Sequence, residues 1–227
     1  MGRYVYPEQV KMSVKLSRKF QPRDFIVPAP TGARPVKVRV IGVHDSNVLT
    51  TEMVEELPVN HGEVESHPEK DICKVAVINR HKPDGGMSIG YVHGFGLKRG
   101  AVASTYAHDA HNLIVLGTSE QEMAFAANTL VEASGGMTAV EGENVLALLK
   151  MPIAGLMSDL PAEEVAAKLS ELSRAWATLG SPLASPFMTM SLLSLVVIPE
   201  IRITDKGIVN VYNNCFTTLL AEETQSK

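Results

Sequence analysis

Short apolar runs that alternate with polar residues, separated by turns rich in glycine and proline, mark the first half of the chain. From Val36 to Val43 the residues are largely β-branched and alternate in polarity, which is typical of a strand with one buried face. The runs at 72–80 and 87–94 have the same character, and HKPDGG at 81–86 supplies the proline and glycines of a turn. The pattern predicts a first strand at 36–43, followed by a β-hairpin.

Two further apolar runs, GAVASTYA at 100–107 and NLIVLG at 112–117, are expected to be strands. The segment after them has the apolar spacing of a helix. A helix is predicted over about 118–135, with Thr118 or Ser119 as its cap and Gly135 at its end. Its apolar positions recur at helical spacing: Met123, Ala126, Ala127 and Leu130.

A second helix is predicted over about 161–179. We expect Asp159 to cap it, Pro161 to lie in its first turn and Gly180 to close it. Its apolar stripe consists of Val165, Leu169, Leu172 and Trp176.

The remaining segments add hairpins. Residues 137–149 predict two strands that turn at 141–144, and 201–211 predict strands around a turn at 205–207, whereas 185–199 fits a buried helix or a strand equally well. Strands and helices occur in blocks joined by hairpins, without steady alternation. We therefore expect an α+β fold, with mixed but mostly antiparallel sheet packed by a few helices.

The two ends of the chain differ from its middle. Residues 1–35 are rich in basic residues and proline, and each proline disfavours helix around it, so we expect an extended lead-in or linker. Residues 36–220 are expected to form the α+β domain, and 221–227 a polar tail.

Composition excludes several classes of partner. The net charge of -4, with both signs mixed, provides no basic field for nucleic acid. The longest apolar stretch, at 188–199, is too short to cross a bilayer, so no membrane partner is expected. Cys73 and Cys215 fit neither a zinc spacing nor a redox pair, which indicates a reducing, cytoplasmic location.

Candidate chemistry concentrates in HDAHN at 108–112, where His108, Asp109, His111 and Asn112 lie between two apolar runs. Imidazole and carboxylate groups together can bind a transition metal, or can form a base with the acid that orients it. Alternatively, the segment is a polar turn whose side chains bond local backbone groups. Its position between apolar runs favours partial burial, and buried polar groups require partners.

A second polar feature is GYVHGFGLKRG at 90–100, where Lys98 and Arg99 follow three glycines. A phosphate cradle is one interpretation, but the spacing matches neither the P-loop nor the dinucleotide fingerprint, so tight turns are the simpler one. His81 and His93 lie near the glycine-rich hairpin, from which they could reach the 108–112 cluster.

Three long motifs occur in a familiar order: the segments at 94–130, 135–169 and 186–211. Together they resemble the C-terminal region of bacterial and archaeal adenine deaminases of the amidohydrolase superfamily, over roughly Asp24 to Val211. The resemblance implies hydrolysis of adenine to hypoxanthine and ammonia, in purine salvage, with a divalent metal of manganese, iron or zinc type. It also implies that the metal ligands lie on a (β/α)₈ barrel of about 250 residues, which this chain does not contain.

The leading hypothesis is that the chain is the C-terminal domain of an adenine deaminase, active together with a barrel domain or subunit, in a homo-oligomer that binds adenine. The alternatives are a non-catalytic structural or oligomerisation domain of an amidohydrolase, and a stand-alone metal hydrolase that uses the cluster and His81. The candidate residues are His108, Asp109 and His111 for catalysis, and Asn112, His81 and Lys98 for substrate binding.

Overall fold

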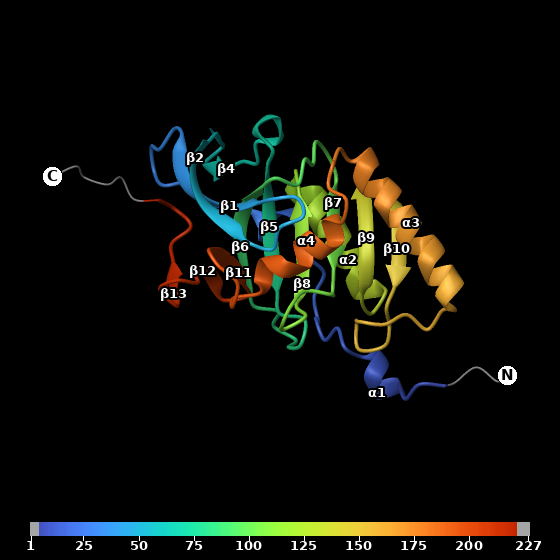
Figure 1. The fold of residues 1–227 in the computed structure, drawn as a ribbon. Coiled ribbons are helices and arrows are strands. Elements are labelled where there is room, and N and C mark those ends of the chain that lie inside the picture. The colour runs from blue at the N-terminus through green and yellow to red at the C-terminus, as the bar shows by residue number, and fades with distance from the viewer. Residues whose placement is uncertain (1–4, 222–227) are drawn as a thin grey trace.

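A computed structural model describes residues 5–221, which form an eight-stranded sheet covered by helices on both faces (Figure 1). The strand order is β10-β9-β7-β8-β5-β6-β1-β2, and every neighbouring pair is antiparallel except β1 and β6. This arrangement confirms the predicted α+β class. The strands are β1 (Val36–Val43), β2 (Thr50–Leu57), β5 (Ile72–Ile78), β6 (Met87–His93), β7 (Ala101–Ser104), β8 (Leu113–Gly117), β9 (Gly136–Glu141) and β10 (Asn144–Lys150).

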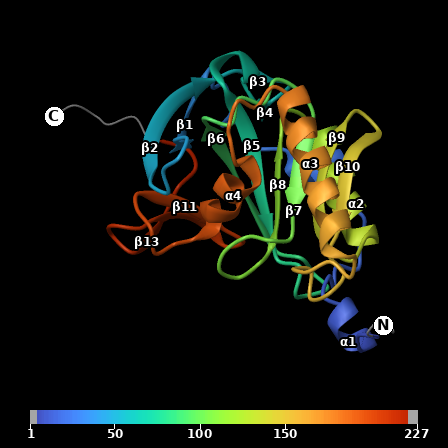
Figure 2. The same ribbon diagram turned by 45° about the vertical axis from the view of Figure 1, so that its right-hand side comes forward.

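The helices divide between the two faces of the sheet, as Figures 1 and 2 show together. On one face, α2 (Glu120–Glu132) packs over β7, β8 and β9. On the other face, α3 (Ala162–Thr178) covers β9 and β10, and α4 (Pro186–Ser191) follows it. Because side chains alternate along a strand, β5, β7 and β8 contribute residues to separate cores on both sides.

Two smaller sheets complete the fold. A three-stranded antiparallel sheet contains β11 (Ile201–Thr204), β12 (Gly207–Asn210) and β13 (Cys215–Thr217), and its buried isoleucines join the core beneath α3 and α4. A short pair consists of β3 (Val59–Asn60) and β4 (Glu63–Val64).

The N-terminal segment packs against the domain. It contains α1 (Glu8–Lys11) and a 3₁₀ turn at Pro22–Phe25. Phe20 and Phe25 are buried beside α2, and the backbone of Phe20 exchanges two hydrogen bonds of 2.9 Å with the side chain of Asn128. The division of the chain at residue 35 stays a prediction, and the predicted tail lies outside the described residues from 222 onward.

The local predictions succeed where a pattern is regular. The hairpin with a turn at 141–144 is confirmed by β9 and β10, and Ser119 caps α2 by accepting a hydrogen bond from the Glu122 amide. The cap predicted at Asp159 is wrong, because α3 begins at Ala162, with Pro161 at its N-cap and no side-chain cap. Among the described residues, no helix is long and apolar enough to span a membrane.

Candidate functional site

The predicted polar cluster lies on the connection between β7 and β8. β7 ends at Ser104, earlier than the sequence predicts, and residues 105–112 leave the sheet; we call this segment the histidine turn. The His111 amide donates to the Ala107 carbonyl at 2.7 Å, and the His108 amide donates to the Ser191 carbonyl at 2.9 Å. The turn is therefore closed on itself and attached to the end of α4.

Three aromatic rings pack together in the histidine turn. The ring centroid of Tyr106 lies 5.1 Å from that of His108 and 5.4 Å from that of His111, and the two imidazoles are 5.5 Å apart. Both histidines are half-buried, whereas Asp109 is exposed at the tip of the turn. The imidazoles are therefore held by ring contacts while part of each remains accessible.

A buried arginine supports the turn from below. Arg80 is 1 % exposed, and its guanidinium donates hydrogen bonds to the carbonyls of His111 at 2.6 Å, Ser13 at 2.9 Å and Ala154 at 2.9 Å. Burial lowers the pKa of Arg80 to about 10, which leaves it charged near neutral pH. Because His111 and Ala154 both have positive φ, one cation stabilises two segments of left-handed backbone.

Asn112 and His81 are also tied to this region. Asn112 is buried, and its Nδ2 donates to Asp205 Oδ1 at 3.1 Å, while Asn79 Nδ2 donates to Asp205 Oδ2 at the same distance. His81 Nε2 lies 2.7 Å from the Ala110 carbonyl, so this nitrogen carries the proton and donates. Within the described residues, His111 Nδ1 and Asn112 Oδ1 are buried without a hydrogen-bond partner.

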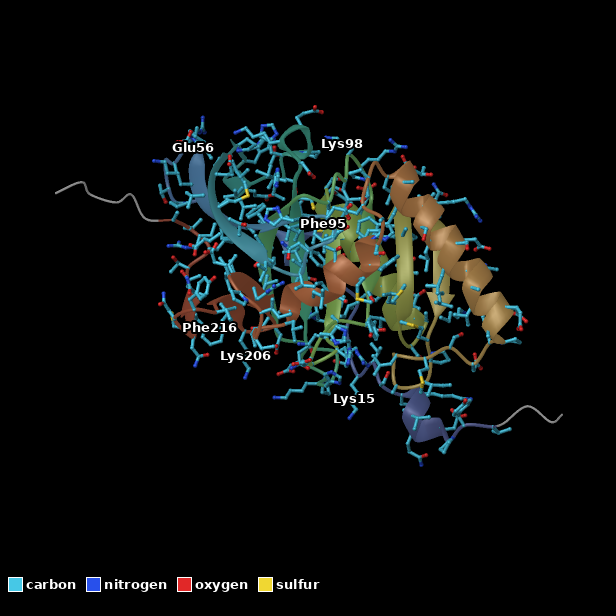
Figure 3. All side chains as sticks on the ribbon, viewed as in Figure 1. Lys15, Glu56, Phe95, Lys98, Lys206 and Phe216 are labelled. Atoms are coloured by element: carbon cyan, nitrogen blue, oxygen red, sulfur yellow. The ribbon has the colours of Figure 1, made fainter. Side chains whose placement is uncertain are left out.

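Lys98 lies apart from the other candidates. It precedes β7, whereas the histidine turn follows that strand, and its Nζ donates to the Pro68 carbonyl at 2.9 Å. Figure 3 shows Lys98 at the opposite end of the molecule from Lys15, whose amide donates to the Arg80 carbonyl. The structure thus brings together His81, His108, Asp109, His111 and Asn112, and it separates Lys98 from them.

An apolar groove adjoins the histidine turn at Tyr106. It consists of two cavities of about 500 and 350 Å³ that share Tyr106, Met137 and Leu169. The wall between β10 and α3 adds Met151 and Met157, and α4 adds Met188. We call this feature the methionine groove.

The candidate residues do not fit a self-contained metal centre. In the part of the chain that the structure describes, no three His, Cys, Asp or Glu side chains are placed to hold one ion. In addition, His81 Nε2 is already bonded to a carbonyl, and His111 Nδ1 is buried. A catalytic metal site normally needs three protein ligands and an open position, and the described residues do not supply such a set.

Comparison with known proteins identifies the family. Residues 47–215, which include the histidine turn and all lining residues of the methionine groove, match the family described as adenine deaminase C-terminal domain. The chain belongs to this family. The adenine deaminase of Moorella thermoacetica is 51% identical over 205 residues, which are 90% of this chain and 34% of that protein. The adenine deaminase of Clostridium botulinum strain Langeland is 44% identical over 223 residues, or 98% of this chain and 37% of that protein.

The chain therefore spans about a third of the length of the adenine deaminases it matches. The adenine deaminase of Ruegeria pomeroyi gives the same proportion, with 46% identity over 92% of this chain and 35% of that protein. The order of motifs in the sequence pointed to this family correctly, and to its C-terminal region.

Three features of this adenine deaminase C-terminal domain were not predicted from the sequence. Arg80 stood at the end of a predicted strand, and nothing near it in the sequence marks its three distant acceptors. Tyr106 was assigned to a strand, although it lies in the histidine turn. The methionine groove was not predicted either, and two of the methionines that line it, Met157 and Met188, are 57% and 51% exposed. An unusual density of methionine near the second helix was the available signal.

The pH dependence of stability provides a test of the environment of His111. Burial lowers the pKa of His111 below its ordinary value of 6.5, and the nearby His108 and Arg80 lower it further, while Asp109 opposes them. Because the unfolded chain binds this proton more tightly, the contribution of His111 to stability is complete above 6.5 and declines as the pH falls toward the folded pKa.

We expect His111→Asn to flatten this decline in urea denaturation compared between about pH 7.5 and about pH 5.5. Asparagine tolerates the positive φ at this position, so the backbone of the turn is retained. An unchanged pH slope in the variant would show that His111 titrates equally in the folded and unfolded chain.

Proposed function

We propose that this chain acts as the C-terminal part of an adenine deaminase, and that the histidine turn faces the purine when the domain is assembled with the rest of a longer enzyme. The reaction is hydrolysis at C6 of adenine, which yields hypoxanthine and ammonia. The observation that carries the proposal is the pair of half-buried imidazoles, held by Tyr106 and Arg80 at the rim of a groove. The relatives' printed names supply the reaction.

The proposed roles follow from proton chemistry. The departing amine must gain a proton, and an imidazole is the side chain best suited to supply one near neutral pH. His108 is the proposed donor or purine contact, and Asp109, next to it in the chain, is the proposed carboxylate partner. His111, whose pKa is lowered, is the neutral partner. Asn112 and His81 are the further candidates for purine contact, and Lys98 stays a separate prediction.

The metal of the complete enzyme is proposed to lie outside this chain. A manganese, iron or zinc site would then belong to the barrel expected in the preceding part of the longer protein. The support is that the described residues of this chain supply no three-ligand set. The two cysteines are unpaired, one of them exposed, which supports the proposed cytoplasmic setting. The proposed role there is purine salvage.

A chimera tests the proposed function. This chain would replace the matched third of the Moorella thermoacetica adenine deaminase, to which it is 51% identical. We expect the chimera to convert adenine to hypoxanthine, followed by absorbance. His108→Ala in the chimera should lower kcat/KM at least about tenfold, equivalent to about 1.4 kcal/mol of barrier.

His44→Ala serves as the control, because His44 is an exposed histidine on the loop between β1 and β2. It should leave kcat/KM unchanged. If His108→Ala is as active as the parent chimera, the catalytic assignment is wrong, and the alternative of a structural or oligomerisation domain is preferred. A parent chimera without activity, although folded, would contradict the proposed function as a whole.

A further inference from the structure

Several large apolar side chains of the methionine groove are exposed to solvent and do not belong to the buried core. Leu169, Met157 and Met188 line it and are 42%, 57% and 51% exposed. Along α3, its wall is a stripe at helical spacing: Ala162, Val165, Ala166, Leu169 and Ser173. Contiguous apolar surface of this kind marks an interaction site more often than a free surface.

The character of the groove suits an extended apolar partner. Methionine side chains are unbranched and polarisable, so a groove lined by them adapts to an inserted helix or loop. The two cavities are continuous through Tyr106 and Leu169, and they run beside α3 toward α4. A partner seated there would touch the same Tyr106 ring that packs on His108 and His111.

The N-terminal segment indicates which partner this is. The Ala154 amide donates to the Val10 carbonyl at 2.6 Å, and Ala154 belongs to the loop that forms one wall of the groove. Figures 1 and 2 show α1 beside this loop, at the edge of the domain. Val5 and Met12, on the same segment, are 81% and 68% exposed.

In the relatives, the matched region is a C-terminal domain of about a third of the protein, so the other two-thirds approach from the N-terminal side. We infer that the methionine groove docks an apolar segment from the part of the longer polypeptide that precedes this domain, an inference that rests on the proposed function for its partner. Docking there removes Tyr106 from water and places His108 beside the docked part. A tethered partner also has a high effective concentration, which a second copy of the chain lacks.

Hydrogen exchange tests the inference without relying on activity. The isolated chain and the Moorella chimera would be compared peptide by peptide. In the chimera, amide exchange over 151–158 and 162–169 should slow by at least about tenfold. Leu169→Lys combined with Met157→Lys should restore fast exchange, because each places a charge in the groove.

Ala167→Lys is the matched control, since it lies on the exposed side of α3, outside the groove lining. It should retain the protection. Equal exchange in the isolated chain and the chimera would overturn the inference, as would protection of the isolated chain that rises with its own concentration, which indicates a second copy. An active chimera with a freely exchanging groove would overturn the docking inference alone. A protected groove in an inactive chimera would overturn the proposed function alone.

Discussion

Arg80→Met is expected to lower the free energy of unfolding by roughly 3 kcal/mol, because three carbonyl groups lose a charged donor at once. Methionine fills much of the space of the arginine stem, so the cost comes from the lost hydrogen bonds and not from a large cavity. The measurement is urea denaturation followed by fluorescence of Trp176, the one tryptophan of the chain.

Two further variants serve as comparisons for Arg80→Met. Arg174→Met, on the exposed side of α3, should change stability by no more than about 0.5 kcal/mol. Gly155→Ala should destabilise in the same direction as Arg80→Met, since a Cβ there would lie 2.7 Å from the Arg80 guanidinium and the φ is +70°. If Arg80→Met proves no more harmful than Arg174→Met, water replaces the guanidinium adequately and Arg80 does not hold the turn.

Trp176→Ala is expected to cost roughly 3–5 kcal/mol, the range for removing a large aromatic side chain from a core. Trp176 is 1% exposed; its ring stacks on that of Phe95 with centroids 5.9 Å apart and forms a T-shaped pair with that of Phe187 at 5.3 Å. Because Phe187 also lines the methionine groove, loss of the Trp176 ring should also loosen the packing of the groove wall at Phe187. Circular dichroism during urea denaturation measures the effect, since the variant has no tryptophan.

Trp176→Phe provides the comparison, because it retains a ring between Phe95 and Phe187 and leaves a smaller void. It should fall between the parent and Trp176→Ala in stability. A variant Trp176→Ala with a loss below about 1 kcal/mol would show that the core under α3 collapses around the missing ring.

The sequence predicted elements whose residues form a regular pattern and missed those that depend on distant contacts. The helix after Ser119 and seven of the eight strands of the central sheet follow local periodicity, so they were identified correctly. β2, with the sequence TTEMVEEL, was not predicted, because it is an edge strand whose polar residues face partly outward. A half-exposed edge strand has a weak apolar signal.

In the candidate site, too, the local pattern was predictable and the distant contacts were not. His108, Asp109, His111 and Asn112 were recognisable as polar residues between apolar runs. The role of Arg80 in holding these residues could not be recognised from the sequence. Its guanidinium donates to carbonyls that are 31, 67 and 74 positions away in the chain. Contacts at such separation leave no local pattern, and they are visible only once the sheet has brought the segments together.

The three acceptors of Arg80 have a mechanical consequence for any longer protein that contains this domain. Ser13 belongs to the N-terminal segment, Ala154 to the groove wall and His111 to the histidine turn, so one guanidinium joins all three. The N-terminal segment is therefore attached rigidly to the domain and does not act as a flexible linker. Movement of a preceding domain would then reach the backbone of the histidine turn through the Arg80 guanidinium, without deformation of the sheet.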